Sequence, residues 1–319
     1  MTRGTEQSWF TEIFGDEGTS FGLAIKEKLH EEQSQFQLLT VYDTETFGKL
    51  LVIDGCVMLT ERDNFLYHEM MSHPVLFTHQ SPRRVAIIGG GDCGTLKEVL
   101  KHSGVEKVWQ IDIDERVTRV AEKYFPELCE GNQDPRADIR FADGIAWVKE
   151  QPDNSLDIII VDSTDPVGPA EGLFAVDFYR DCCRALTPEG ILVQQTESPL
   201  LHTNSIIAKA HNDMREAGFH HTQTLPFPQP VYPTGWWSCT MASVNAQLTQ
   251  FRADDAAGTS SGQSLGGSYL VHWVRLISVP LNLIIKPVKL FHFVGNKITI
   301  KSQSPLKVCR KVRMLTGVL

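Results

Sequence analysis

The sequence predicts an α/β fold in which a doubly wound parallel sheet follows a small antiparallel β domain. An apolar run, Val85–Ile88, leads directly into the glycines Gly89–Gly91 and then into a helical pattern. From there to residue 217, apolar runs alternate with helical segments, which is typical of parallel sheets. Before residue 61 the chain holds only short strand-like runs separated by turns.

The N-terminal part is predicted from four runs rich in apolar or β-branched residues. Phe47-Gly48 and Asp54-Gly55 are turn signals between them. We expect strands at residues 21–28, 36–42, 49–53 and 57–60, and a helix at residues 61–72. The predicted N-terminal domain therefore spans residues 1–72.

The second domain, residues 73–257, is predicted to be Rossmann-like and of the methyltransferase type. Its expected strands are residues 85–88, 105–111, 139–142, 156–161 and 191–195. Its expected helices follow the glycine turn and lie at residues 115–125, 145–150, 174–186 and 205–217. Ligands of such sheets bind beyond the carboxyl ends of the strands. Four acids follow predicted strands at this rim: Asp92, Asp112, Asp143 and Asp162.

These acids have a structural and a functional interpretation. Each side chain alone fits a helix cap or a tight turn. Four like charges around one site raise each other's pKa, however, and such a cluster is maintained more readily when a cation fills it. Asp92 is the most informative, because a carboxylate in the glycine turn repels a pyrophosphate and attracts positive charge.

The spacing of Asp112 indicates the ligand. It lies 23 positions after Gly89, close to the offset of ~20 residues at which an acid binds ribose hydroxyls. A sulfonium nucleoside, S-adenosylmethionine or its decarboxylated form, supplies both a ribose and a cation. The decarboxylated form fits better, because it brings no carboxylate near Asp92. The chain holds no Tyr-x-x-x-Lys pair, which disfavours a nicotinamide dehydrogenase.

The loop from Asp162 to Pro169 holds two acids three residues apart, then two prolines and a glycine. Prolines restrict φ, so the loop has few conformations. It is either a rigid surface connection or a lid over the site, with Asp162 at its root as base or cation ligand.

Composition narrows the function classes. A net charge of −9 argues against nucleic acid or an anionic membrane as partner. Seven cysteines without metal-ligand spacing suit a reducing compartment, and we expect a cytoplasmic protein without a bound metal. We see neither a signal peptide nor a run of ~18 apolar residues.

Six motifs together resemble the polyamine aminopropyltransferases, specifically bacterial spermidine synthases. They cover about residues 8–255 and are Asp54-Gly55 with Thr60-Glu61-Arg62-Asp63, Tyr67-His68-Glu69-Met70, Gly89-Gly90-Gly91-Asp92, Asp143-Gly144, the Asp162–Pro169 loop, and Tyr232-Pro233-Thr234-Gly235-Trp236. The resemblance implies aminopropyl transfer from decarboxylated S-adenosylmethionine to putrescine, which gives spermidine and methylthioadenosine. It also implies a homodimer or homotetramer, and a co-substrate rather than a cofactor.

The resemblance also implies residue roles. Asp162 would accept the proton, and Asp92 would hold the aminopropyl ammonium. The polyamine site would comprise Tyr67, His68, Asp92, Asp162, Ser163, Thr164, Asp165 and Tyr232. The adenosyl part of the donor would contact Gln37, Asp112, Asp143, Gly144 and Pro169.

Three features depart from the resemblance. Cys93 replaces a usual glycine, which would narrow the pocket or strain the turn. Asp112 replaces a usual glutamate. Residues 258–319 show no resemblance, begin with a linker-like GTSSGQSLGGS, and contain nine Lys or Arg but no Asp or Glu. We interpret them as a tail without a function of its own; a basic tail for an anionic partner is the alternative.

Two other functions fit the same residues. One is a small-molecule S-adenosylmethionine methyltransferase, since a fold does not fix a function. The other is a polyamine-binding protein that has lost activity through Cys93 or through its altered C-terminal part.

Overall fold

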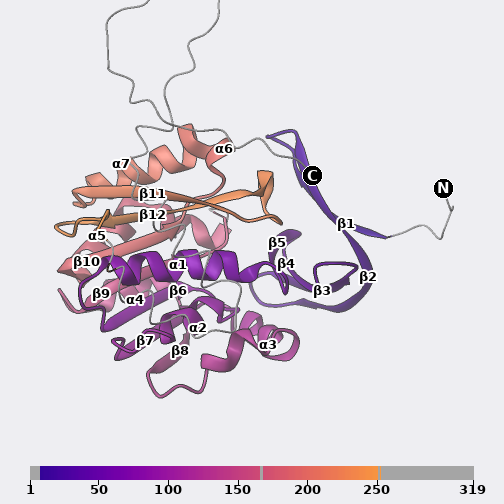
Figure 1. Ribbon diagram of the computed structural model, residues 1–319, viewed down its shortest axis with the longest axis horizontal. Helices are drawn as coiled ribbons and strands as arrows, with labels where there is room; N and C mark the ends of the chain where they lie inside the picture. The colour runs from indigo at the N-terminus through magenta and orange to yellow at the C-terminus, as the bar shows by residue number, and fades with distance from the viewer. Residues whose placement is uncertain (1–7, 166–167, 251, 253–319) are drawn as a thin grey trace, which may run out of the picture. The chain divides into compact units, whose positions relative to one another are not determined.

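A computed structural model describes residues 8–165, 168–250 and 252, and these form two sheets (Figure 1). The first sheet is antiparallel, with strand order β1-β2-β3-β4-β5. Its strands are β1 (Trp9–Phe14), β2 (Thr19–Gln33), β3 (Leu38–Thr44), β4 (Lys49–Ile53) and β5 (Cys56–Thr60). The predicted antiparallel β domain is therefore confirmed, with one strand more than the sequence indicated.

The second sheet has seven strands in the order β11-β12-β10-β9-β6-β7-β8. Strands β10, β9, β6, β7 and β8 are parallel, and an antiparallel hairpin of β11 and β12 completes one edge. The strands are β6 (Arg84–Gly89), β7 (Lys107–Asp112), β8 (Ala137–Phe141), β9 (Leu156–Asp162), β10 (Leu186–Gln195), β11 (His221–Pro228) and β12 (Trp236–Ser243). The predicted Rossmann-like doubly wound fold is confirmed.

Helices cover both faces of this sheet. On one face lie α1 (Asn64–Thr78) and α2 (Gly94–Leu100), which bury Met71, Leu96 and Val99 against it. On the other face lie α4 (Gly144–Glu150), α5 (Val176–Ala185) and α7 (Ala208–Glu216). The remaining helices are α3 (Glu115–Tyr124), α6 (Pro199–His202), and the short segments η1 (Leu128–Gly131), η2 (Gly168–Phe174), η3 (Thr203–Ile207) and η4 (Pro233–Gly235).

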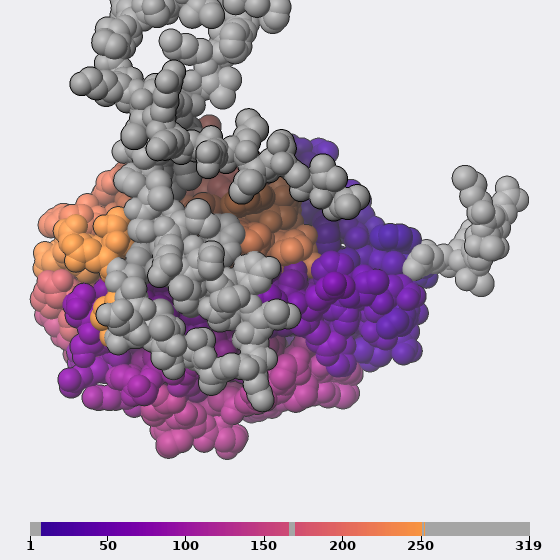
Figure 2. Space-filling model, in the orientation of Figure 1, coloured from indigo at the N-terminus to yellow at the C-terminus, as the bar shows by residue number. Residues whose placement is uncertain are grey.

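Both sheets belong to one compact unit and contact each other. The first sheet forms the indigo surface in Figure 2. Val117 and Val120 of α3 pack against Leu39 and Leu51 of the first sheet. On its other side Val231 packs against Leu50. Polar contacts add to this, because the Tyr232 hydroxyl donates to the Met58 carbonyl at 2.5 Å. The N-terminal sheet is thus fixed beside the carboxyl end of the larger sheet.

Helix α1 differs most from its prediction, because it starts at Asn64 instead of 61 and continues to Thr78 instead of 72. The predicted domain boundary after residue 72 consequently falls inside it. Pro74 lies within the helix and removes the amide that would bind the Met70 carbonyl. The Cys239 thiol donates to that carbonyl at 3.6 Å instead, so the buried helix tolerates the proline.

Other boundaries also needed correction. Strand β1 and the β11–β12 hairpin were not predicted. The run from Thr187 to Gly190, which was expected to separate a helix from a strand, belongs to β10 as an irregular stretch with a register shift between Leu186 and Ile191. The helix expected at 205–217 is divided between the end of the π-helical η3 and α7, and the unpredicted α6 precedes them. The tail predicted at 258–319 lies outside the described residues.

Candidate active site

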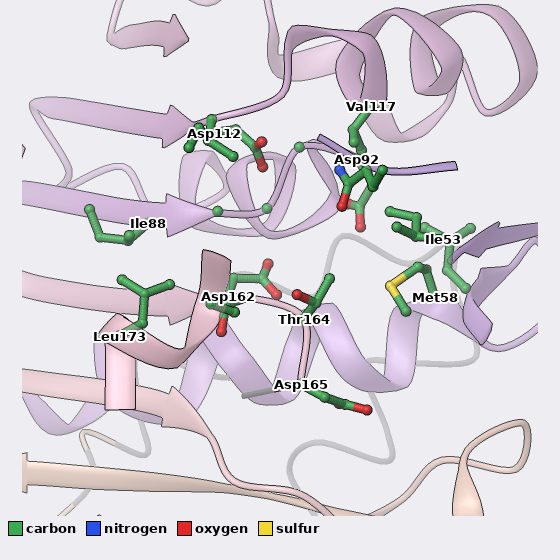
Figure 3. A pocket seen from close by; sticks show the side chains of 18 of the residues that line it. Ile53, Met58, Ile88, Asp92, Asp112, Val117, Asp162, Thr164, Asp165 and Leu173 are labelled. Carbon is green, nitrogen blue, oxygen red and sulfur yellow. The ribbon is translucent and has the colours of Figure 1, made fainter. Parts of the chain in front are cut away.

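A cavity of about 400 Å³ opens at the carboxyl ends of β6, β7 and β9 and is bounded on its other side by the N-terminal sheet. Strands β6 and β9 are neighbours although far apart in sequence, so the chain reverses its winding direction here. Ligands of doubly wound sheets bind at such a switch point. Figure 3 shows the side chains of Asp92, Asp112 and Asp162 directed into the cavity, with Ile53 and Met58 of the N-terminal sheet opposite.

The glycine turn after β6 is shaped by its contact with the end of β9. Gly89 has φ +86°, and a Cβ on it would collide with the Asp162 carbonyl oxygen. That carbonyl accepts the Gly90 amide at 2.8 Å. Only glycine permits both this backbone conformation and this approach. The turn therefore brings Asp92 and Asp162 to the same cavity.

Asp162 is the last residue of β9, and both of its carboxylate oxygens are occupied. The Tyr67 hydroxyl donates to Oδ1 at 2.7 Å, and the Thr95 hydroxyl donates to Oδ2 at 2.6 Å. Burial raises the pKa of Asp162, and the charge of Asp92 raises it further. The two hydroxyls oppose this shift and fix the direction of the carboxylate. The Asx-turn interpretation of Asp162 is wrong, because its side chain bonds to α1 and α2 instead.

Asp92 pairs with a buried histidine. Its Oδ1 lies 3.2 Å from His68 Nε2 and accepts the Gly94 amide at 2.7 Å. Burial opposes charge on both groups, but their attraction prevails, so the pKa of His68 is raised and that of Asp92 is lowered. A Cβ on Gly94 would collide with the His68 ring. Asp92 therefore bonds to the start of α2, as a cap would, and also presents a carboxylate to the cavity.

The other end of the cavity presents acids held by backbone amides. Asp112 ends β7, accepts the Asp114 amide at 2.8 Å, and has its pKa raised to about 6, mainly by burial. Asp114, not Asp112, caps α3. Asp143 caps α4 through the Ile145 amide at 2.8 Å and still lines the cavity. The Gln37 side-chain amide donates to the Asp114 carboxylate at 3.0 Å, and this bond directs the Gln37 side chain toward the same end of the cavity.

The structure brings nearly all the predicted site residues into this one cavity. Its lining includes Gln37, Tyr67, His68, Asp92, Asp112, Asp143, Gly144, Asp162, Ser163, Thr164, Asp165 and Tyr232. Pro169 lies in η2, and its side chain is outside the described part of the chain. Cys93 is fully buried and does not line the cavity, so it strains the turn (φ +69°) without narrowing the pocket.

A second cavity, about 380 Å³, adjoins the first and shares Tyr67, Asp165 and Tyr232 with it. Four further acids line it, and two of them, Glu12 of β1 and Glu197 after β10, are buried. Burial raises the pKa of Glu12 to about 7 and that of Glu197 well above its usual range. Within the described residues Glu197 Oε1 has no hydrogen-bond partner. The second cavity is therefore an acidic extension with an unsatisfied acceptor.

Comparison with known proteins places this geometry in a family. Residues 64–252 match the spermine/spermidine synthase domain, and residues 8–61 match the spermidine synthase tetramerisation domain. A polyamine aminopropyltransferase of Methylococcus capsulatus is 65% identical over 250 residues, which cover 78% of this chain and 87% of the relative. One of Thioalkalivibrio sulfidiphilus is 62% identical over 251 residues, covering 79% of this chain and 88% of the relative.

The chain belongs to the spermine/spermidine synthase family. It is accordingly a transferase enzyme of polyamine biosynthesis.

Solved structures of the family agree with the fold. A spermidine synthase in complex with the transition-state analogue AdoDATO superimposes with a TM-score of 0.77 at 30% identity, over 85% of this chain and 96% of that one. The Thermotoga maritima spermidine synthase gives a TM-score of 0.76 at 30% identity, with the same coverage. The fold and the family are thus established by sequence and by structure.

Two kinds of site residue escaped the sequence analysis. Thr95 stands in the first turn of α2, and no pattern marks one threonine there as a partner of Asp162. Glu12 and Glu197 lie on segments far apart in the chain that were predicted neither as strands nor as motifs.

Among the described residues, no cluster of three or more His, Cys, Asp or Glu has a geometry for a metal ion. The described helices include none long and apolar enough to span a membrane.

Proposed function

We propose that this enzyme transfers the aminopropyl group of decarboxylated S-adenosylmethionine to putrescine, giving spermidine and methylthioadenosine. The observation that carries the proposal is the pair of carboxylates, the partly buried Asp92 and the buried Asp162, that face one cavity at the switch point (Figure 3). Both substrates are cations, and carboxylates that face a cavity of low polarity favour such ligands. The names of the relatives and of the AdoDATO complex support the same reaction.

We assign the donor to the end of the cavity that holds Asp112. The ribose hydroxyls would donate to Asp112, as acids at this position do in doubly wound folds. Asp143, Gly144, Gln37 and Pro169 would surround the adenosyl part. The aminopropyl ammonium would bind Asp92. S-adenosylmethionine itself would bring a carboxylate toward Asp92 and Asp162, so the decarboxylated donor is preferred.

We assign the acceptor to the region where the two cavities meet. The attacking nitrogen would lie at Asp162, between Tyr67 and Tyr232, whose rings are 5.9 Å apart. The remaining ammonium would reach into the acidic extension toward Asp165, Glu12 and Glu197. Ser163 and Thr164 connect the two regions. Aromatic faces add cation–π attraction of about 0.5–2 kcal/mol each.

The chemical step needs one base and no other reagent. An ammonium is not a nucleophile, so the acceptor must lose a proton, and Asp162 would take it. The free amine then attacks the carbon beside the sulfonium. The new C–N bond forms as the C–S bond breaks, and its electron pair stays on sulfur, leaving neutral methylthioadenosine. Holding both cations for in-line attack supplies the entropic advantage. We propose that neither a metal nor a further cofactor takes part.

We also propose that the chain forms a homo-oligomer through its N-terminal sheet. Residues 8–61 match the tetramerisation domain, and Trp9 and Ile13 of β1 are 60% and 75% exposed. Large apolar side chains on one strand are typical of an interface between copies. A cytoplasmic location remains our expectation from the sequence.

A product assay tests the reaction. The full chain is incubated with each sulfonium donor and, side by side, putrescine, cadaverine or spermidine. We expect methylthioadenosine and spermidine from the decarboxylated donor with putrescine as the best acceptor. S-adenosylhomocysteine would show methyl transfer instead. Turnover of another acceptor with none of putrescine would keep the donor assignment and reject the acceptor.

A further inference from the structure

Cys93 is unusual both in its backbone and in its surroundings. It has φ +69° and ψ 2°, a left-handed backbone conformation that residues other than glycine, asparagine and aspartate rarely adopt. Its thiol is fully buried and turned away from the cavity. There Cys93 Sγ lies 3.6 Å from the Gly91 carbonyl oxygen and accepts the Gln110 amide at 3.6 Å. The residue next to Asp92 is therefore a cysteine held in a fixed direction.

A second thiol, that of Cys129, contacts the turn that holds Cys93. Cys129 belongs to η1, which packs against α2, and its Sγ donates to the Asp92 carbonyl at 3.9 Å. Interaction with the Cys129 thiol and with the Gln110 and Asn132 amides lowers the pKa of Cys93, although burial opposes this. The same interaction raises the pKa of Cys129. Within this pair the thiolate form is therefore favoured on Cys93 over Cys129.

We propose that Cys93 and Cys129 are a site of reversible oxidation by peroxides, and that the disulfide formed between them weakens binding at Asp92. Both cysteines are free thiols in the structure. They come from two segments that contact each other, and the Cys129 thiol donates to the carbonyl of Asp92, the residue before Cys93. A low-pKa thiol with a second thiol beside it is the arrangement that peroxide-sensitive sites use.

The chemistry balances with peroxide as the oxidant. The Cys93 thiolate attacks one peroxide oxygen, the O–O bond breaks, and a sulfenic acid and hydroxide result. The Cys129 sulfur then attacks the sulfenic sulfur. The S–O bond breaks and the oxygen leaves as water with the Cys129 proton. Each sulfur loses one electron, and the peroxide is reduced to two water molecules. Cys129 is only partly buried, so peroxide reaches the pair from its side.

The bond would change the position of Asp92. A disulfide needs its sulfurs about 2.05 Å apart. Drawing them together removes the Cys129 donor from the Asp92 carbonyl and pulls on the residue that follows Asp92. Among the described residues, the Gly94 amide and His68 are the partners of the Asp92 carboxylate, at 2.7 and 3.2 Å. A shift of the turn moves that carboxylate away from its ligand.

Peptide mapping tests the disulfide independently of the proposed function. The reduced full chain is treated with hydrogen peroxide, blocked with a thiol reagent and digested with trypsin. Cleavage after Arg84, Lys97, Lys123 and Arg136 places Cys93 in peptide 85–97 and Cys129 in peptide 124–136, each with one cysteine. We expect these two peptides to be cross-linked, with two hydrogens lost, and dithiothreitol to separate them. If both thiols are blocked and no cross-link forms, the proposal is wrong.

Binding measurements test the consequence. We expect oxidation to weaken binding of decarboxylated S-adenosylmethionine about tenfold, the weight of one charge-assisted hydrogen bond, and methylthioadenosine less. Cys129→Ser and Cys93→Gly should both abolish the peroxide effect, each compared with its own reduced form. Cys183→Ser, which removes a partly buried thiol on α5, should keep it. A cross-linked enzyme with unchanged donor affinity, or equal peroxide sensitivity in Cys129→Ser, would overturn the inference.

Discussion

The two ends of the active-site cavity use carboxylates in different ways. At the donor end, Asp112 and Asp143 accept backbone amides of the helices that follow their strands. At the acceptor end, Asp162, Glu12 and Glu197 are buried, and their pKa values are all raised. The backbone thus fixes the donor end to receive neutral hydroxyls. The acceptor end carries acids whose charged forms are favoured when a cation compensates them.

This difference predicts where protons move. A bound ammonium lowers the pKa of a neighbouring carboxyl group, because opposite charges favour the ionised form. Acceptor binding should therefore ionise Asp162 and prepare it to take a proton back from the attacking nitrogen. At neutral pH, proton exchange at the donor end should involve mainly the pair of His68 and Asp92, because Asp112 titrates near pH 6.

The largest expected effect comes from Asp162→Asn. The amide keeps the shape of the side chain but removes its charge and its basicity. We expect kcat to fall about 10²–10⁴-fold, the usual weight of a positioned base. Methylthioadenosine affinity, measured by calorimetry, should change little. Raising the pH should restore part of the rate, because free amine then needs no base.

A matched control separates this effect from loss of general negative charge. Asp177→Asn removes a carboxylate whose side chain is 90% exposed and lies on α5. It should leave kcat within about twofold, since exposed charges contribute little. Turnover of Asp162→Asn close to that of wild type at neutral pH would identify another proton acceptor, and Asp165 would be tested next.

The donor end was more predictable from sequence than the acceptor end. A glycine turn after an apolar strand, and an acid some twenty residues later, follow from local geometry that a continuous segment encodes. The acceptor end draws Glu12, Thr95 and Glu197 from three distant segments. Their meeting depends on how the N-terminal sheet docks on the larger one, and no local pattern records that.

Secondary structure failed where tertiary contacts override local preference. Pro74 indicates a helix end, yet α1 continues because Cys239 satisfies the freed carbonyl. Strand β1 has an exposed Trp9 and Ile13, so its alternation does not resemble a half-buried strand. Conversely β9, with all of its residues buried, was predicted almost to its ends because a parallel strand covered on both faces is uniformly apolar.

The second effect in size concerns Asp92→Asn. Of the donor and methylthioadenosine, only the donor carries an ammonium. Decarboxylated S-adenosylmethionine should therefore bind about ten- to a hundredfold more weakly, because a charge-assisted hydrogen bond contributes ~1.5–3 kcal/mol. Methylthioadenosine should bind nearly as before. Equal weakening of both ligands would mean that Asp92 only shapes the turn.

Proton release gives a second readout for the same variant. Asp92 raises the pKa of His68 and so favours its charged imidazole in the free enzyme, although burial opposes this. An ammonium that binds Asp92 repels this charge and lowers the pKa of His68, so donor binding should release protons near neutral pH. Calorimetry in buffers of different ionisation enthalpy measures the release. We expect proton release when the wild-type enzyme binds the donor. We expect none when it binds methylthioadenosine, and none when Asp92→Asn binds the donor.

The smallest effect is expected at the donor end, in the pH dependence of methylthioadenosine binding. Burial raises the pKa of Asp112 to about 6, so its carboxyl group is ionised above that pH and protonated below it. Ribose hydroxyls donate more strongly to a carboxylate than to a neutral acid, by about 1 kcal/mol. Affinity should therefore fall about three- to tenfold between pH 7 and pH 5. Asp112→Asn should bind methylthioadenosine weakly, with an affinity that does not change between pH 7 and pH 5. Asp112→Glu keeps the charge, so its affinity should still depend on pH. If the slope persists in Asp112→Asn, another group near the cavity titrates, and the donor end is not the fixed, backbone-held site that its contrast with the acceptor end indicates.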